Sequence, residues 1–284
     1  MQIQSVLVTG GNRGIGLDAV RLLSERLPAS ALVFLGSRSL ANAAEALDKL
    51  KQGNKTSNHS YQNIVPIQLD VTDPNSIANA VEFVKANTST GSLDVLINNS
   101  GIAGDNSRDV LAVNVLGVRA TQAAFLPIMT TSNAHFIVVA SEVGAWTTNK
   151  LTQELQQKLL DVTSWKYESD AETLAEDWIK AKEGQESVYK WPEPATTFGA
   201  YGISKALVLA NTRRFTIDHP EVLVNPVCPG YCATKLNGFN GFRTPAQGAE
   251  SIIWPLFNDV KNGEFYRDGK VHSFNTPRPD VIPK

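Results

Sequence analysis

The chain has 284 residues, of which 42% are hydrophobic and 19% charged, and its net charge is −2. This length and composition suit a single α/β enzyme domain with a sizeable core. The balanced charge gives no electrostatic basis for binding nucleic acid or an anionic membrane, and we see no apolar run that would span a bilayer. Neither partner is therefore expected.

The cysteine and histidine content predicts neither disulfides nor a metal site. Cys228 and Cys232 are too few for a disulfide framework, and none of the four histidines lies in a ligand motif. The first residues read directly as a strand, so we expect no signal peptide. These features favour a cytoplasmic protein.

The N-terminal segment predicts a dinucleotide site. Residues 3–8 are apolar and β-branched, the glycine-rich run 9–16 follows, and residues 17–27 have apolar side chains at helical spacing. Glycines let the backbone approach a pyrophosphate, and a helix N-terminus offers free N–H groups. The spacing G-x-x-x-G-x-G joins Gly10 to Gly16. An ordinary βα turn is the alternative interpretation.

The remaining chain alternates between strand and helix patterns. Further strands are predicted at 31–35, 64–69, 93–97, 134–140 and 222–227, and further helices at 40–50, 75–86, 108–125, 200–213 and 245–256. This alternation predicts an α/β fold, a single doubly wound Rossmann-type parallel sheet with helices on both faces. We expect one domain over 1–284. Residues 272–284 contain three prolines and read as a loose C-terminal tail.

Polar residues or glycines follow several of the predicted strands. Asp70 and Val71 follow the third strand, residues 98–101 the fourth, Ser141 the fifth, and Pro229 with Gly230 the sixth. Ligands of such sheets bind beyond the carboxyl ends of the strands. These residues therefore fall where a cofactor would lie.

Tyr201 and Lys205 lie four residues apart in a predicted helix, which places them on one face. A Lys beside a Tyr favours the phenolate, so we expect the pKa of Tyr201 to be below its usual value of about 10. Such a phenol can give a proton to a carbonyl oxygen or take one from an alcohol. Taken alone, the pair could equally be two residues on a solvated helix face.

With these motifs in this order, the chain resembles the short-chain dehydrogenase/reductase family. Ser100 departs from it, since the family more often has Ala there. The resemblance implies a catalytic set of Asn114, Ser141, Tyr201 and Lys205. Tyr201 would be the general acid, Lys205 would tune it and hold the nicotinamide ribose, and Ser141 would bind the substrate carbonyl. Asn114 would kink its helix and hold a water that relays protons. Read alone, Asn114 could be a core amide and Ser141 a helix cap.

The predicted cofactor contacts lie in the glycine-rich run, after the strands and on the helix of the Tyr–Lys pair. They are Gly10, Asn12, Arg13, Gly14, Ile15, Gly16, Arg38, Asp70, Val71, Asn98, Ser100, Gly101, Tyr201, Lys205, Pro229, Gly230 and Thr234.

Two arginines decide the predicted cofactor. Arg38 follows the second strand, where an enzyme preferring NAD usually has an acid, and Arg13 lies within the glycine-rich run. A guanidinium suits the 2′-phosphate of NADP. Two solvated arginines are the alternative. We expect NADP(H), and because cells keep this cofactor largely reduced, carbonyl reduction is the favoured direction.

Residues 142–199 separate Ser141 from Tyr201 and are predicted to form a helical insertion. Helical patterns cover 151–160 and 171–182. The aromatic side chains of the insertion could form a lid over an apolar substrate or simply pack it onto the domain; they are Trp165, Tyr167, Trp178, Tyr189, Trp191 and Phe198. The run 154–158 is similar to that of the monomeric carbonyl reductases and their salutaridine and menthone reductase relatives. This resemblance implies a monomer.

The sequence therefore predicts NADPH-dependent reduction of a small-molecule carbonyl (a ketone, aldehyde or quinone of apolar or aromatic character) to an alcohol. One alternative is an NADP-dependent alcohol or hydroxysteroid-type dehydrogenase working oxidatively. Another is a non-catalytic NADP-binding scaffold. Cys228 could be a redox-sensitive thiol or an inert one.

Overall fold

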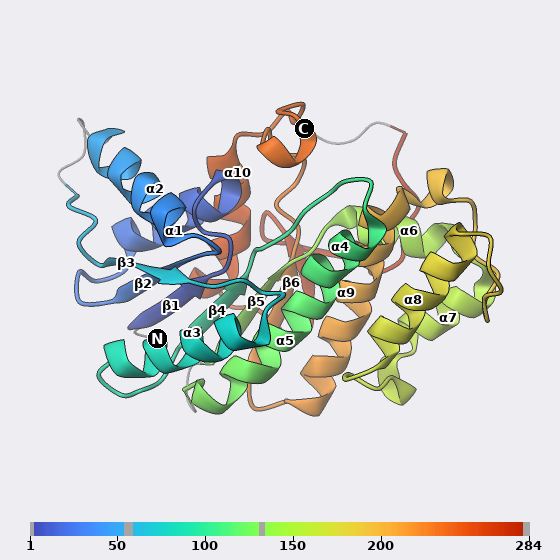
Figure 1. Cartoon of the computed structure of the whole chain (residues 1–284), viewed down its shortest axis with the longest axis horizontal. Coiled ribbons are helices and arrows are strands. Elements are labelled where there is room, and N and C mark those ends of the chain that lie inside the picture. Colours follow the sequence, from blue (N-terminus) through green and yellow to red (C-terminus); the bar gives the residue numbers. More distant parts are fainter. Residues whose placement is uncertain (1–2, 54–58, 131–133, 281–284) are drawn as a thin grey trace.

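One twisted sheet with helices packed on both faces forms the body of the molecule (Figure 1). The structure is a computed structural model that describes residues 3–53, 59–130 and 134–280. Within them the strand order is β3-β2-β1-β4-β5-β6-β7-β8. The order reverses between β1 and β4, which creates the topological switch point where cofactors bind in doubly wound sheets.

Seven strands run parallel, so their carboxyl ends share one edge of the sheet. They are β1 (Ser5–Val8), β2 (Leu32–Ser37), β3 (Ile64–Gln68), β4 (Val95–Asn98), β5 (His135–Val139), β6 (Leu223–Val227) and β7 (Phe265–Arg267). The eighth, β8 (Lys270–His272), pairs antiparallel with β7.

Two apolar clusters hold the helices to the sheet. Alternate side chains of each buried strand reach opposite faces: Val6 and Val8 pack with α1 (Gly14–Arg26), α2 (Leu40–Gly53) and α10 (Pro245–Ile253). Leu7 faces the other way. It packs with α3 (Pro74–Asn87), α5 (Gly117–Phe125) and α9 (Gly199–Asp218). The predicted doubly wound α/β class is thus confirmed.

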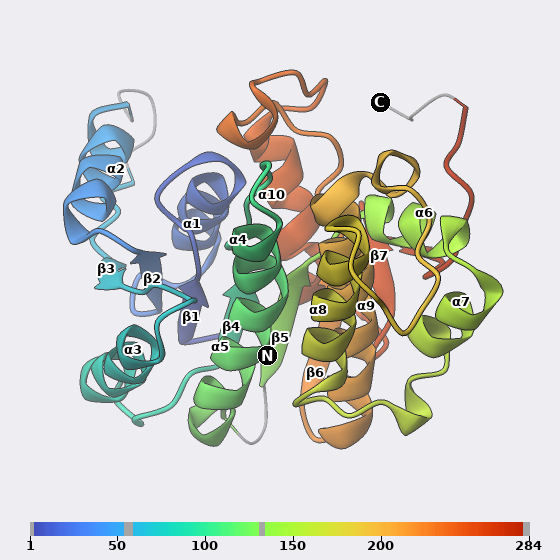
Figure 2. The same cartoon turned by 45° about the vertical axis from the view of Figure 1, so that its right-hand side comes forward.

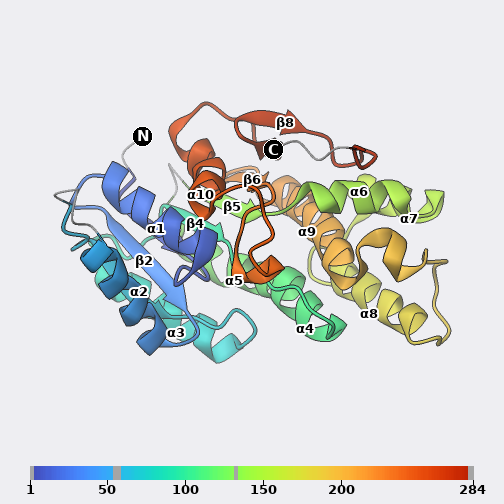
Figure 3. The same ribbon diagram turned by 90° about the horizontal axis from the view of Figure 1, so that it is seen from above.

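The segment 142–199 contributes three helices at one end of the molecule, opposite α1 to α3 (Figure 3). They are α6 (Glu142–Lys150), α7 (Gln153–Leu160) and α8 (Asp170–Lys182). Trp165 and Trp178 are buried in a core shared with α9 and with α4 (Ser107–Leu111). Of the two interpretations of the aromatics, packing accounts for these two side chains.

The C-terminal residues 272–280 lie against α6 and α7, which corrects the expectation of a loose tail for this part. The Asn275 side chain bonds those of Asn149 and Gln156, and the Thr276 amide donates to the Ala145 carbonyl. His272 is the last residue of β8 and pairs with Phe265 of β7. Residues 281–284 lie outside the described residues.

One helical stretch, Ser107–Ile128, is long and apolar enough to cross a membrane by length and composition alone. This corrects the expectation that no run of that kind is present. Core helices pass the same test. Leu111 and Val115 of this stretch pack in the insertion core, and Phe125 is buried under the sheet. Packing inside the protein accounts for these apolar side chains.

Candidate active site

The glycine-rich turn after β1 packs so tightly that backbone atoms occupy the space where side chains would lie. Gly10 and Gly14 have φ of +63° and +54°, in the region that favours glycine. A Cβ on Gly16 would lie 2.4 Å from the Gly10 carbonyl oxygen. The α1 helix starts at Gly14 without a side-chain cap, so its first N–H groups point toward this turn.

The end of β4 is fastened to this turn. The Asn99 amide group donates to the carbonyls of Thr9 and Gly10, at 2.9 and 3.2 Å. The Thr9 hydroxyl accepts from the backbone N–H groups of Asn99 and Ser100. Asn98 accepts from the Thr121 hydroxyl at 2.6 Å. The predicted residues 98–101 therefore line the same edge as the glycines.

The segment after β3 lies at the same carboxyl edge of the sheet. Asp70 accepts from the Thr72 amide and hydroxyl, which fixes a tight turn. Val71 packs onto Gly117 of α5, where a Cβ would come within 2.7 Å of the valine side chain. Both predicted residues lie at the carboxyl edge.

Asn114 lies in a π-helical turn, Ala112–Leu116, between α4 and α5. Its side chain donates to the Ile102 carbonyl and the Ser204 hydroxyl and accepts from the Ile102 amide, at 2.9, 3.0 and 2.9 Å. π-Turns insert an extra residue into a helix and often occur at functional sites. The helix irregularity expected at Asn114 is present, and the amide joins the strand β4 segment to α9.

Ser141 and Tyr201 meet between β5 and α9. Ser141 follows β5 and is the N-cap of α6, where its hydroxyl accepts from the Val143 amide at 3.2 Å. Ser141 also lies close enough to the Tyr201 phenol to lower its pKa. Both side chains are half-buried. Ser141 is thus the helix cap of the plainer interpretation, and its hydroxyl also faces the phenol.

Lys205 lies one turn beyond Tyr201 and is buried. Its ammonium donates to the Val139 carbonyl at 2.7 Å and lies 5.8 Å from the centroid of the Tyr201 ring. Burial lowers the pKa of Lys205 to about 8, although the neighbouring Cys228 opposes this shift. The lysine charge is therefore less firmly held than that of an exposed lysine.

The pKa of Tyr201 differs in direction from the sequence-based expectation. Burial raises it to about 12, the nearby Cys228 adds to this, and Ser141 only partly offsets them. The Lys205 ammonium is bonded to Val139 instead of the phenol oxygen, which leaves desolvation dominant. At neutral pH Tyr201 is thus a protonated phenol.

Cys228 directly follows β6, and its thiol influences the pKa of both Tyr201 and Lys205. Its sulfur accepts from the backbone N–H groups of Glu142 and Gly230, both at 3.4 Å. Burial raises the pKa of the Cys228 thiol to about 11. A thiol that stays protonated is a poor nucleophile, which favours the inert interpretation. In the described ranges no group of three or more His, Cys, Asp or Glu side chains is arranged around a metal position.

The loop after β6 borders the glycine-rich turn. A Cβ on Gly14 would contact Thr234, and one on Gly248 would contact both Ile15 and Pro229 at 3.3 Å. Figure 2 shows the segment between β6 and α10, in orange, as a loop standing above α10. Pro229, Gly230 and Thr234 thus lie at the predicted edge.

Arg13 and Arg38 mark the outer rim of the edge. Both are exposed: Arg13 is the N-cap of α1, and Arg38 follows β2 directly. Across the described residues, neither guanidinium has a hydrogen bond or ion pair to the protein. Asn12 and Ile15 lie on the same turn as Arg13.

The structure brings the predicted site residues to one edge of the sheet. Three other residues support them: Thr9 and Asn99 tie the glycine-rich turn to β4, and Ser204 joins Asn114 to α9. Thr9 and Asn99 fall within the motifs, so their position could have pointed to a supporting role. Ser204 gives no separate signal in the sequence.

A doubly wound sheet with a glycine-rich turn at its switch point is the architecture of dinucleotide-binding enzymes. The family model described as short chain dehydrogenase matches residues 4–153, more than half of the chain. The chain belongs to this family. It is therefore an oxidoreductase that uses a nicotinamide cofactor on a small-molecule substrate.

Comparison with individual proteins shows which members of the family the chain is similar to. The (+)-neomenthol dehydrogenase of Capsicum annuum is 30% identical over 317 residues, which cover 94% of this chain and 96% of that protein. The solved salutaridine reductase of Papaver somniferum has a TM-score of 0.79 at 27% identity, over 93% of this chain and 99% of that one. An NADPH-bound carbonyl reductase from chicken fatty liver has a TM-score of 0.68 at 25% identity, over 96% and 100%. The predicted resemblance to the carbonyl, salutaridine and menthone reductases is confirmed.

Proposed function

We propose that this protein reduces a carbonyl group of an apolar small molecule to an alcohol, with NADPH as the cofactor. The observation that carries the proposal is the meeting of Ser141 and a protonated Tyr201 beside the buried Lys205, next to the glycine-rich turn. The relatives named above support it, since two of them are named as reductases: salutaridine reductase and carbonyl reductase.

The residues at the sheet edge fit a dinucleotide. The close approach of Gly16 to Gly10 leaves no room for a side chain, and the uncapped N-terminus of α1 suits a pyrophosphate. Residues 70–71 and 98–101 would border the adenosine half, and Pro229 and Thr234 the nicotinamide half. Bound there, NADPH supplies the hydride that the protein itself lacks.

The protein's own part of the reaction is proton transfer and orientation. Tyr201 holds its proton at neutral pH and gives it to the carbonyl oxygen as negative charge develops there. The Ser141 hydroxyl accepts in its capping bond, which leaves its own hydrogen to donate to the same oxygen. Lys205 brings a positive charge one helical turn away, which stabilises the phenolate left behind. Asn114 keeps α9 in register with β4.

Reduction of a panel of carbonyl compounds tests this function. Purified protein with NADPH is expected to turn over at least one compound among bulky apolar ketones, aldehydes, quinones and diketones, measured as loss of NADPH absorbance. The corresponding alcohols with NADP⁺ form the second arm, which addresses an oxidative dehydrogenase. Faster alcohol oxidation at neutral pH would contradict the proposed direction, and a scaffold would bind NADPH without turning over any compound.

The preference for NADPH is expected to depend on Arg13 and Arg38. Replacing both with Ala should lower kcat/KM for NADPH by about 100-fold, because each charged hydrogen bond to a phosphate contributes about 1.5 kcal/mol or more. With NADH, which lacks the 2′-phosphate, kcat/KM should change little. Arg26→Ala, an exposed arginine at the other end of α1, is the matched control. Equal losses with both cofactors would contradict the assignment.

We also propose that the protein is a monomer of the cytoplasm. The insertion supports a monomer, because its α8 packs over α4 and α9. Two ion pairs, Arg108 with Glu176 and Arg119 with Glu172, join α8 to α4 and α5. That outer surface is therefore covered by the chain itself.

A further inference from the structure

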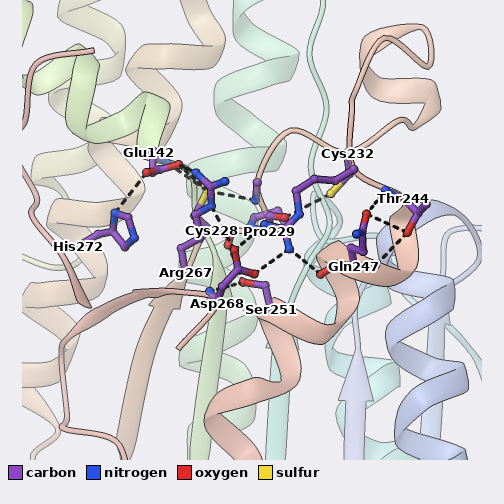
Figure 4. Close-up of polar contacts among 12 residues, drawn as sticks. Glu142, Cys228, Pro229, Cys232, Thr244, Gln247, Ser251, Arg267, Asp268 and His272 are labelled. Atoms are coloured by element: carbon purple, nitrogen blue, oxygen red, sulfur yellow. Dashed lines mark hydrogen bonds and ion pairs between the residues drawn. The ribbon is translucent and has the colours of Figure 1, made fainter. Parts of the chain in front are cut away.

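A row of ionisable side chains, joined by ion pairs and hydrogen bonds, lies outside the proposed active site and plays no part in the chemistry described above. It runs from His272 through Glu142, Arg267 and Asp268 to Arg243, and Figure 4 shows its first four members. These residues come from the start of α6, the β7–β8 hairpin and the loop after β6. The row therefore links three segments that are distant in sequence.

At one end, Glu142 is the residue directly after Ser141. Its side chain is only 14% exposed, and it accepts from Arg267 Nη1 at 2.5 Å and from His272 Nδ1 at 3.2 Å. Burial alone would raise the pKa of Glu142, but His272 and Arg267 together hold it below its usual value. Glu142 is thus a buried carboxylate that needs its partners.

At the other end, Arg243 fastens the base of the loop 231–243. Its guanidinium donates to both carboxylate oxygens of Asp268, at 2.6 and 2.7 Å. Its backbone pairs with Tyr231 and Ala233, so it closes the loop. The side chain lies flat on Gly230, where a Cβ would come within 2.7 Å of Arg243 Cδ. The loop between these anchors exposes Phe239 and Leu236.

Arg267 lies between the two carboxylates and is buried. It contacts Glu142 closely, but its Nε is 3.5 Å from the same Asp268 oxygen that Arg243 Nη1 binds at 2.6 Å. A buried guanidinium that loses one carboxylate is driven toward another. Without Glu142, Arg267 would compete with Arg243 for Asp268.

We propose that Glu142 is a positioning residue: by holding Arg267, it leaves Asp268 to Arg243 and keeps the loop 231–243 closed at its base. The loop follows Pro229 and Gly230 and borders the proposed carbonyl site, so this inference rests on the proposed function for its effect on substrate. Glu142 has no contact with the loop 231–243. It thereby couples the start of α6, which carries Ser141, to the closure of this loop.

Amide hydrogen exchange of the full-length chain, followed for peptides within 231–243, tests this coupling without any substrate. In Glu142→Gln the loop is expected to exchange about tenfold faster than in the wild type, a size typical of coupled residues in one network. In the double variant Glu142→Gln/Arg267→Gln the competing charge is gone, so protection of the loop should return toward wild type. Glu250→Gln, which breaks an exposed ion pair on α10, is the matched control and should change nothing.

Kinetics give a second readout. Glu142→Gln is expected to raise KM for the carbonyl compound several-fold, and adding Arg267→Gln should reverse that rise, which a general loss of folding would not do. Loop exchange in Glu142→Gln equal to that of the control would overturn the proposal. The proposal would also be overturned if the loop of Glu142→Gln/Arg267→Gln exchanged as fast as that of Glu142→Gln, or if the double variant were as unfolded as the single variant. A wild-type chain that reduces no carbonyl would refute the proposed function and leave the exchange experiment intact as a separate test.

Discussion

Tyr201→Phe is expected to lower kcat for carbonyl reduction by about 10³-fold, within the range of about 10²–10⁴ that a positioned proton donor contributes. The structure gives the physical reason: burial raises the pKa of Tyr201 to about 12, so the phenol is the protonated group beside Ser141 at neutral pH. Phe keeps the ring that packs near Lys205 and removes only the hydroxyl group, and with it the transferable proton. Steady-state kinetics with NADPH and the best carbonyl compound measure the effect.

Binding must be separated from chemistry in this experiment. Titration of NADPH by its fluorescence is expected to give a Kd for Tyr201→Phe within about threefold of the wild type, a difference below 1 kcal/mol. Tyr189→Phe, a half-buried tyrosine of the insertion, is the matched control and should retain its activity. A Tyr201→Phe variant with near wild-type kcat would show that Tyr201 is not the general acid.

Gly144→Ala is expected to destabilise the protein by about 1–3 kcal/mol or more and to lower kcat in the fraction that folds. An added Cβ would lie 2.4 Å from the carbonyl oxygen of Lys205 and 2.6 Å from its carbonyl carbon, so α6 and α9 must separate. Backbone cannot swing away as a flexible side chain can. The helix that moves carries Tyr201 and Lys205.

Urea unfolding followed by circular dichroism measures the loss of stability. The matched control is Gly53→Ala at the end of α2, where an added Cβ meets none of the described residues within 4 Å. Gly53→Ala should leave both stability and kcat close to wild type. If the two alanine variants unfolded at the same urea concentration, the close contact of α6 with α9 would not be as tight as described.

The parallel strands β1 to β6 could be predicted from the sequence because each is a short apolar run bounded by turn residues. The β7–β8 hairpin was missed, since three residues such as Phe265–Arg267 are too few to establish a period. Helix α6 was missed as well. Its residues pack through Gly144 and Ala145 against α9, and such small side chains leave no helical stripe in the sequence.

The predicted site residues could be placed at one sheet edge because the strand ends and the motifs coincide. The direction of the Tyr201 pKa shift could not be predicted, because it depends on which acceptor the Lys205 ammonium binds. In the structure that acceptor is the Val139 carbonyl. Glu142 escaped notice for a similar reason. Its partner Arg267 is 125 residues away, and neither residue lies in a motif.

The insertion between Ser141 and Tyr201 ties catalysis to the completion of folding. Its tryptophans bury themselves against α9, the helix that presents Tyr201, so the two halves of the proposed site are joined through a chain segment that must itself fold. Closing a long loop carries an entropic cost that is recovered only when its core docks. A working site therefore requires the insertion to be folded onto α9, so substitutions that empty this core should lower activity even though they lie away from Tyr201.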